Sequence, residues 1–292
     1  MASLAQWFAG ARPRTLPAAV SPVLVGSGAA YAAGNGDLGL AVLALTVSGC
    51  LQVGVNYAND YSDGIRGTDE QRVGPVRLVG QRLANPQTVR LAAYLAFFFA
   101  GLFGLALVAL TQLWWLLLVG AGAIVAAWRY TGGSNPYGYR GLGEVMVFVF
   151  FGLVATLGTQ LTQAGRVTLA GLAGAVGVGA LASAILVANN LRDIPTDTVV
   201  GKRTLAVRLG DGRTRRLWEL LVVAAFVMVL VCALGQPWAL LGLLAAPLAV
   251  GPRRVVRAGA LGRDLVPVLV ATGRLQLGYA ALLGLGLFLS RP

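Results

Sequence analysis

Long apolar segments alternate with short polar ones along almost the whole chain. A helix needs about 20 mostly apolar residues to cross the hydrocarbon core of a bilayer. Nine segments approach or reach this length and predict membrane-spanning helices: residues 16–34, 39–58, 91–110, 113–130, 143–162, 169–189, 217–234, 237–251 and 266–289. The eighth is the shortest, and it begins and ends near Pro237 and Pro247. The pattern predicts an all-α, polytopic integral membrane protein with nine transmembrane helices.

The composition strengthens this prediction and narrows the possible chemistry. Of the 292 residues, 57% are hydrophobic and 12% are charged, against about a quarter charged in soluble domains. The net charge of +12 does not require nucleic acid, because basic loops attract anionic lipid. Histidine is absent, which excludes His metal sites and Ser-His-Asp triads. Cys50 and Cys232 lie far apart in apolar segments, so we expect them to pack in the membrane.

The basic residues indicate an orientation. All but two of the 23 Lys and Arg residues lie at the N-terminus or near the loops after the second, fourth, sixth and eighth predicted helices; the exceptions are Arg166 and Arg291. Basic loops favour the cytoplasm. We therefore expect the N-terminus inside, the C-terminus outside, and the functional site at the long loops on the cytoplasmic face of a cell membrane.

Acidic residues gather at the inner ends of the second and sixth predicted helices. These two segments hold six of the eleven acids: Asp60, Asp63, Asp69, Glu70, Asp193 and Asp197. If the helices continue through them, helical spacing places two polar sets on common faces: Asn56, Asn59 or Asp60, and Asp63 in the first, and Asn189 or Asn190, Asp193 and Asp197 in the second. Gly64 and Gly67 are expected to end the first helix, and Pro195 to bend the second.

Two facing carboxylate clusters in an apolar protein repel each other unless a cation lies between them. Oxygen ligands without His or Cys suit Mg²⁺, which favours one or two carboxylates together with substrate phosphate oxygens. The alternative is that the acids are solvated helix ends paired with nearby arginines. The repetition of the cluster favours the metal, and the similar segments 74–80 and 205–210 suggest a weak internal repeat.

Basic side chains beside the acids fit the same interpretation. A diphosphate bridged by Mg²⁺ remains anionic, and Lys202, Arg203, Arg66 and Arg140 would hold it and stabilise it as it departs. Lys202 is the only lysine in the chain. The alternative is that these residues only reflect the basic character of any inner loop.

Residues 59–69 and 189–210 resemble the two Asp-rich motifs of the UbiA-type intramembrane aromatic prenyltransferases. Residues 11–17 and 139–144 support the resemblance, which extends over essentially the whole chain. It is greatest with the 1,4-dihydroxy-2-naphthoate polyprenyltransferases of menaquinone biosynthesis. One departure is Thr198, where many relatives carry Arg; Lys202 or Arg203 would compensate.

The resemblance implies a single domain over residues 1–292, with two related halves around a central cavity and one Asp-rich motif in each. It implies transfer of a polyprenyl group from polyprenyl diphosphate to 1,4-dihydroxy-2-naphthoate, with loss of CO₂ and pyrophosphate, giving demethylmenaquinone or its quinol. The expected cofactor is Mg²⁺, as two ions bridging the diphosphate, with Mn²⁺ as a substitute. Partners would be the two substrates and membrane lipid; the oligomeric state is left open.

The resemblance also distributes roles among the candidate residues. One Mg²⁺–diphosphate unit would be bound by Asp60, Asp63 and Asp69 with Asn56 or Asn59, and the other by Asp193, Asp197 and Asn190. The catalytic set would be these five aspartates with Lys202. Substrate contacts would come from Asn56, Asn59, Arg66, Tyr139, Arg140, Glu144, Asn189, Asn190 and Arg203. Glu144 would either pair with Arg140 or help bind the aromatic acceptor.

Two other functions fit parts of the pattern. Another branch of the same superfamily would prenylate 4-hydroxybenzoate, homogentisate or a sugar phosphate. A secondary transporter would also carry intramembrane acids, but near the bilayer midplane, whereas both clusters here lie at the inner helix ends.

Overall fold

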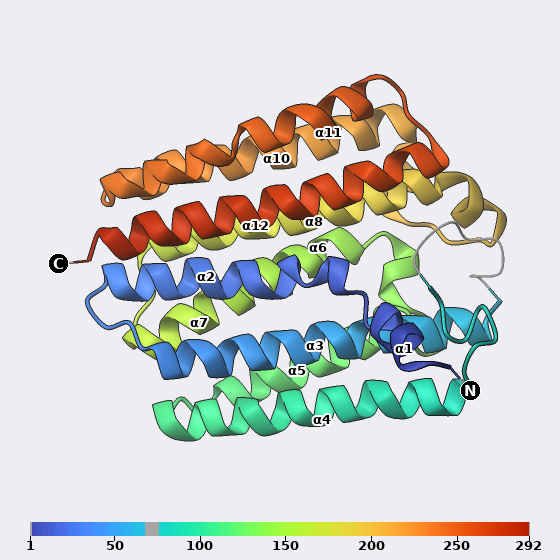
Figure 1. The fold of residues 1–292 in the computed structure, drawn as a ribbon, viewed down its shortest axis with the longest axis horizontal. Helices are drawn as coiled ribbons and strands as arrows, with labels where there is room; N and C mark the ends of the chain where they lie inside the picture. Colours follow the sequence, from blue (N-terminus) through green and yellow to red (C-terminus); the bar gives the residue numbers. More distant parts are fainter. Residues whose placement is uncertain (1, 68–75, 292) are drawn as a thin grey trace.

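The structure is a computed structural model that describes residues 2–67 and 76–291. Within these residues every regular element is helical, so the predicted all-α fold is confirmed. The long helices lie side by side in one bundle, with the chain termini at opposite ends (Figure 1).

The first part of the chain forms the elements α1 (Leu4–Gly10), η1 (Pro13–Thr15), α2 (Pro17–Ala32), α3 (Leu38–Ile65), α4 (Pro86–Thr111) and α5 (Leu116–Arg129). The middle forms η2 (Tyr137–Arg140), α6 (Gly143–Val147), the π-helix η3 (Phe148–Val154), α7 (Ala155–Ala164) and α8 (Leu169–Val199). The last part forms α9 (Leu205–Leu209), α10 (Asp211–Ala233), η4 (Pro237–Ala245), α11 (Pro247–Arg257), η5 (Gly262–Leu265) and α12 (Val266–Leu289).

Length and composition support six to eight membrane spans in the described residues. Six helical segments qualify alone, and two bent pairs, residues 4–32 and Pro237–Arg257, qualify if each is one span. The predicted segment 113–130 forms α5, whose 14 residues fall short of a full crossing. The expected count of nine spans thus remains a prediction.

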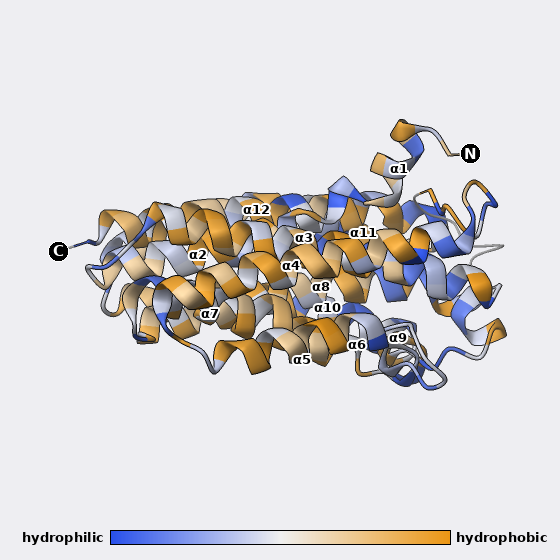
Figure 2. Cartoon of the chain, turned by 90° about the horizontal axis from the view of Figure 1, so that it is seen from below, coloured by the Kyte–Doolittle hydropathy of each residue, from blue (hydrophilic) through white to orange (hydrophobic). Residues whose placement is uncertain are grey.

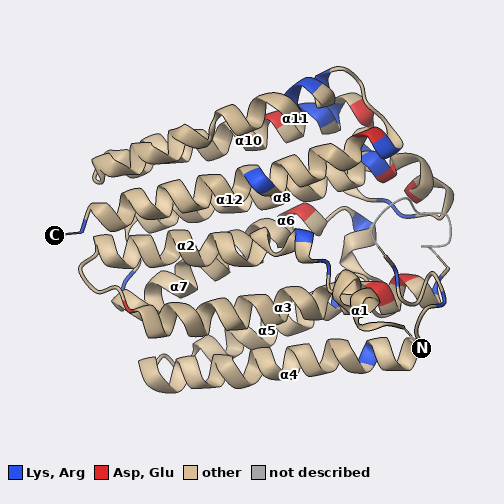
Figure 3. Cartoon of the chain, viewed as in Figure 1, with Lys and Arg blue, Asp and Glu red and all other residues tan. Residues whose placement is uncertain are grey.

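Hydropathy and charge are distributed as a bilayer requires. Apolar residues extend along the length of the bundle, and hydrophilic residues gather toward its ends (Figure 2). Charged residues concentrate at the end that holds the N-terminus (Figure 3). Arg274 departs from the expected loop position, because it lies inside α12 and is exposed.

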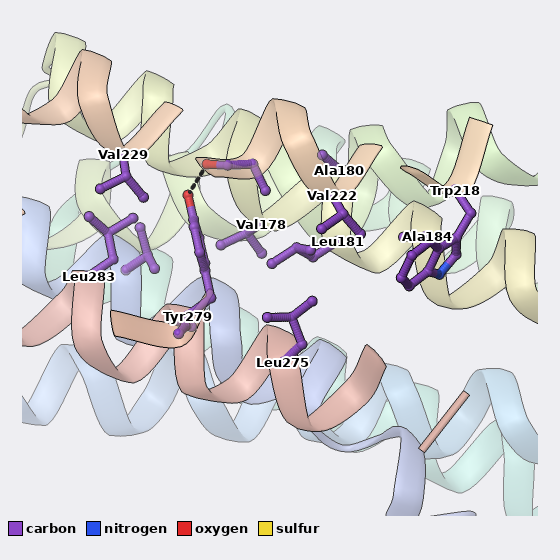
Figure 4. Packing of buried hydrophobic residues seen from close by; sticks show 14 of the residues in the cluster. Val178, Ala180, Leu181, Ala184, Trp218, Val222, Val229, Leu275, Tyr279 and Leu283 are labelled. Carbon is purple, nitrogen blue, oxygen red and sulfur yellow. Dashed lines mark hydrogen bonds between the residues drawn. The ribbon is translucent and has the colours of Figure 1, made fainter. Parts of the chain in front are cut away.

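Helix α8 forms the centre of the second half of the bundle. Small residues along it let neighbouring helices approach closely, as is common between membrane helices. A Cβ atom on Gly177 would lie 2.0 Å from Tyr279 Oη, and that hydroxyl passes α8 to donate to Ala225 O of α10 at 3.0 Å. Figure 4 shows Tyr279 between Val178 and Leu283 in this packing. The buried α8 therefore carries its polar C-terminal turns at a fixed place.

The C-terminal ends of α3 and α8, the two helices that carry the acidic motifs, determine the positions of the polar residues. Helix α3 ends at Ile65, and Gly67 adopts a left-handed conformation with φ of 71°, as the glycines predicted. Helix α8 continues through Pro195 to Val199. Both motifs are therefore presented on the last turns of long helices.

Candidate functional site

The polar residues of the first motif lie on one buried face of α3, as the helical spacing predicted. Asn56, Asn59, Asp60 and Asp63 are each less than 9% exposed. Their hydrogen-bond partners differ, however, so residues that the sequence placed in one group have different roles in the structure.

Asn56 and Asp60 hold neighbouring segments of the chain in place. Asn56 Nδ2 donates to Ala11 O at 2.8 Å and to Thr15 Oγ1 at 2.9 Å, which fixes the segment before α2. The Asp60 carboxylate accepts the backbone N–H groups of Leu78 at 2.7 Å and Val79 at 3.1 Å. These contacts assign both residues a positioning role that the sequence did not reveal.

Asn59 contacts the segment that leads from α5 toward η2. Its Oδ1 accepts from Thr131 Oγ1 at 2.7 Å. Arg66, at the end of α3, donates to the carbonyls of Thr131 and Gly133 and lies over the Tyr139 ring, 5.5 Å from its centroid. Residues 131–139 are thus held against the end of α3.

Asp63 is where the two motifs meet. Its Oδ1 accepts from Tyr139 Oη at 2.6 Å and lies 3.6 Å from Lys202 Nζ. The Lys202 ammonium also lies 4.5 Å from the centroid of the Tyr139 ring, within the range of a cation–π contact. Lys202 and Asp63 are both buried. One acid of the first motif therefore contacts the lysine of the second motif.

Backbone hydrogen bonds fix the position of that lysine. The Lys202 N–H donates to Asp197 O at 2.8 Å, and the Arg203 N–H donates to Tyr139 O at 2.9 Å. The side chains of Arg203 and Arg140 are exposed. η2 and the loop after α8 thus form one layer over the ends of α3 and α8.

The second motif carries its own cation. The Arg192 guanidinium donates to both oxygens of Asp193, at 2.6 and 2.7 Å, and to Asn189 Oδ1 at 2.9 Å. Arg192, Asp193 and Asp197 are all buried. Sequence reasoning assigned no role to Arg192, although an arginine directly before a buried aspartate was a usable signal.

Glu144 contacts the same helix one turn earlier. Its Oε1 accepts from Asn190 Nδ2 at 2.8 Å. The expected alternative of a pair with Arg140 is not formed in the described part of the chain. The hydrogen bond to Asn190 therefore connects this acid to the second motif.

The bundle also holds an apolar cavity of about 700 Å³, and none of the acids or basic residues described above is among its lining residues. Helices α3, α4, α5, α6, η3 and α7 contribute to its wall, with Val55, Gly104, Ile124, Met146 and Phe150 among the lining residues. Tyr130 and Tyr137 also line it, and η2 begins at Tyr137 and continues to the polar Tyr139. Burial raises the pKa of the Tyr137 hydroxyl, which stays a neutral donor to Ala126 O at 2.9 Å.

The oxygen donors fit Mg²⁺ only if the substrate supplies further ligands. Across residues 2–67 and 76–291, no three acids, His or Cys are close enough together to hold a metal by themselves. Mg²⁺ is usually bound by one or two carboxylates plus phosphate oxygens and water, which matches this sparse set. Asp69 and Glu70 lie outside the described residues.

Comparisons with known proteins agree on the kind of molecule. The profile of the UbiA prenyltransferase family matches residues 19–264. A 1,4-dihydroxy-2-naphthoate octaprenyltransferase of Mycobacterium tuberculosis is 58% identical over 280 residues, which cover 96% of each chain. The Escherichia coli protein of the same name is 38% identical, covering 98% of this chain and 96% of its own.

A solved structure has the same fold. A UbiA homologue from Archaeoglobus fulgidus, bound to GPP and Mg²⁺, superposes with a TM-score of 0.70 at 16% identity and covers 97% of this chain and 99% of its own.

Proposed function

This chain belongs to the UbiA prenyltransferase family, and from that premise we propose that it transfers a polyprenyl group from polyprenyl diphosphate to 1,4-dihydroxy-2-naphthoate. The products are demethylmenaquinol, pyrophosphate and CO₂. The observation that carries the proposal is the junction of Asp63, Tyr139 and Lys202, which connects the two acidic motifs beside a large apolar cavity. The naphthoate enzyme of Mycobacterium tuberculosis, at 58% identity, supports this acceptor.

The acids of the site would bind the diphosphate through Mg²⁺, and its cations would bind it directly. Asp63, Asp193 and Asp197, with Asp69 as a further candidate, would hold Mg²⁺ together with the diphosphate oxygens. When bound, Mg²⁺ supplies positive charge that stabilises the departing pyrophosphate. We infer two ions, one for each motif. Asp60 and Asn190 belong to this proposed set, although both already hold neighbouring groups.

Lys202 contributes a fixed positive charge at the same place. Its backbone is held by Asp197 O and its ammonium lies against Asp63 and Tyr139. A cation fixed in this way stabilises charge that develops on the leaving group without having to reorganise. Arg66, Arg140 and Arg203 lie around the site at greater exposure and would guide the anionic substrate toward it.

The cavity would protect the allylic carbocation that remains. Its wall is almost entirely apolar, so water is excluded from the cation. The electron-rich ring attacks the cation, and loss of the ring carboxylate as CO₂ restores aromaticity. The same apolar wall suits a polyprenyl chain, which enters most readily from the bilayer.

The proposed orientation places this site at the cytoplasmic face of the cell membrane. Charged residues gather at the end of the bundle that holds the N-terminus, and the termini lie at opposite ends (Figure 3). Basic residues favour the cytoplasmic side. Nine crossings, counting each bent pair and α5 as one span, would account for the opposite termini.

An assay with purified protein tests the function. The protein is incubated with Mg²⁺, a radiolabelled polyprenyl diphosphate, and 1,4-dihydroxy-2-naphthoate, 4-hydroxybenzoate or homogentisate. We expect a prenylated product, CO₂ and pyrophosphate with the naphthoate only. Excess chelator should abolish turnover, and Mg²⁺ or Mn²⁺ should restore it. Turnover with a different acceptor alone would refute the naphthoate assignment, and full activity in chelator would refute the metal site.

A further inference from the structure

The carboxylate of Glu144 has one engaged oxygen and one without a partner. Glu144 begins α6 and is 6% exposed. Its Oε1 accepts from Asn190 at 2.8 Å, whereas Oε2 is buried with no hydrogen-bond partner among the described residues. Buried polar atoms nearly always have partners, and leaving one without a partner costs free energy. Oε2 is therefore available to a group that the described residues do not supply, such as one on a bound ligand.

Residues close to Glu144 in α6 line the apolar cavity, although Glu144 itself is not among the lining residues. Val147, three residues further on the same face of α6, lines the cavity. Gly143, the preceding residue, packs against Tyr130, which also lines it; a Cβ atom on Gly143 would lie 3.5 Å from Tyr130 Oη. A ligand in the cavity would therefore lie next to the turn of α6 that carries Glu144.

Contacts with α8 hold Glu144 in this place. Ser183 Oγ donates to Glu144 O at 3.1 Å, and Asn190 donates to its side chain. One helical segment further, Gly152 of η3 lies against α8 so closely that a Cβ atom on it would be 2.5 Å from Gly179 Cα. π-Helical turns of this kind are frequent at functional sites. Backbone and side chain are thus both fixed, which prevents Glu144 from turning to another partner.

We propose that Glu144 Oε2 binds a ring hydroxyl of the aromatic acceptor and so determines which acceptors the enzyme takes. This inference rests on the proposed prenyl transfer to a dihydroxynaphthoate. A hydroxyl both donates and accepts a hydrogen bond, so it suits Oε2 whether or not the carboxyl carries a proton. A ring carboxylate would be repelled by an ionised Glu144. The bond therefore orients the ring with a hydroxyl, and not its carboxylate, toward α6.

The test combines variants of Glu144 with acceptors that lack single hydroxyls. The acceptors are 1,4-dihydroxy-2-naphthoate, 1-hydroxy-2-naphthoate and 4-hydroxy-2-naphthoate. Binding is measured by titration of the purified protein, and kcat/KM is measured for each acceptor that reacts. For the wild type, removing the recognised hydroxyl should weaken binding about 10- to 100-fold, as expected for a hydrogen bond to a charged group.

In Glu144→Leu, the dihydroxy acceptor and that monohydroxy acceptor should bind within about threefold of each other, because the partner of the hydroxyl is gone. Glu144→Gln keeps the acceptor for Asn190 and should show an intermediate ratio. The KM for polyprenyl diphosphate should change less than about threefold in Glu144→Gln, which keeps an oxygen for Asn190 of the proposed diphosphate site. Ser183→Ala, which loosens the same turn without removing Oε2, is the matched control and should keep the wild-type ratio.

Two outcomes would overturn the inference. One is an equal loss of binding affinity for every acceptor in Glu144→Leu and Glu144→Gln, which would assign Glu144 a structural role. The other is a wild-type protein that binds all three acceptors equally. If instead the wild type prenylates no naphthoate at all, the proposed function fails and not the role of Glu144 alone.

Discussion

Asp60 and Asp63 lie one turn apart on α3, yet their carboxylates serve different neighbours. Asp60 accepts the backbone N–H groups of Leu78 and Val79, whereas Asp63 faces Tyr139 and Lys202. The resemblance to the family motifs assigned both to metal binding. The structure indicates that truncating them should have different effects.

Asp63→Ala should lower kcat at least about 100-fold, because it removes charge from the reacting region. It should also lower the thermal unfolding temperature, because the buried Lys202 ammonium loses its carboxylate partner. Asp60→Ala should lower both, since two buried N–H groups lose their acceptor, at about 1–3 kcal/mol each. Steady-state assays and thermal unfolding in detergent measure the two effects.

The control for these variants is chosen from the structure. Asp264→Ala, on the exposed η5, should be neutral. Asp37 is unsuitable, because its side chain caps α3 by accepting from Leu40 N at 2.8 Å, and losing a cap costs about 1 kcal/mol. An Asp63→Ala protein whose kcat is no lower than that of Asp60→Ala would contradict the division of roles.

Tyr139 offers a second test at the residue scale. Tyr139→Phe removes the 2.6 Å hydrogen bond to Asp63 but keeps the ring under Lys202. We expect kcat/KM to fall about tenfold, in line with the loss of one charge-assisted hydrogen bond. Tyr139→Leu also removes the ring, so its kcat/KM should fall further. Equal kcat/KM values in Tyr139→Phe and Tyr139→Leu would show that the ring adds nothing to catalysis beyond the hydroxyl.

At the scale of elements, the contact between η3 and α8 positions the start of α6. Gly152→Ala would bring a Cβ atom within 2.5 Å of Gly179 Cα and 2.9 Å of Ala175 O. Both are backbone atoms, so the helices must separate, at a cost of about 1–3 kcal/mol. We expect a lower unfolding temperature and weaker acceptor binding in this variant.

Gly158→Ala is the matched control in the same helical segment. Apart from its own helix backbone and chain neighbours, no atom lies within 4 Å of the added Cβ, and the residue is in α7. Alanine is favoured over glycine inside helices by up to about 1 kcal/mol, so stability should stay equal or rise. A Gly152→Ala protein as stable as Gly158→Ala would show that η3 and α8 can move apart without cost.

At the scale of the whole molecule, orientation can be tested without a catalytic assay. In a background with Cys50 and Cys232 replaced by alanine, single cysteines are introduced at the exposed Thr198 and Asn35. A membrane-impermeant thiol reagent should label Asn35→Cys in intact cells and Thr198→Cys only after the membrane is opened. Labelling of Thr198→Cys from outside would reverse the proposed orientation and the route of the diphosphate.

The fold class, the shared face of the first-motif residues and the family could all be predicted from the sequence alone. A bilayer requires long apolar helices, so the alternation of apolar and polar segments predicted an all-helical membrane protein before any contact was known. Helical periodicity likewise placed Asn56 and Asp63 on one face, because that spacing is a local property of the backbone. The motif resemblance identified the same family as the later comparisons.

What each polar residue contacts was decided only by the tertiary structure. Asp60 meets Leu78, Asp63 meets Lys202, and Glu144 meets Asn190 across 18, 139 and 46 positions of the chain. No local pattern encodes such distances, since they depend on how whole helices pack. The unpartnered oxygen of Glu144 arises in the same way, because an atom lacks a partner only with respect to all the groups that fold around it.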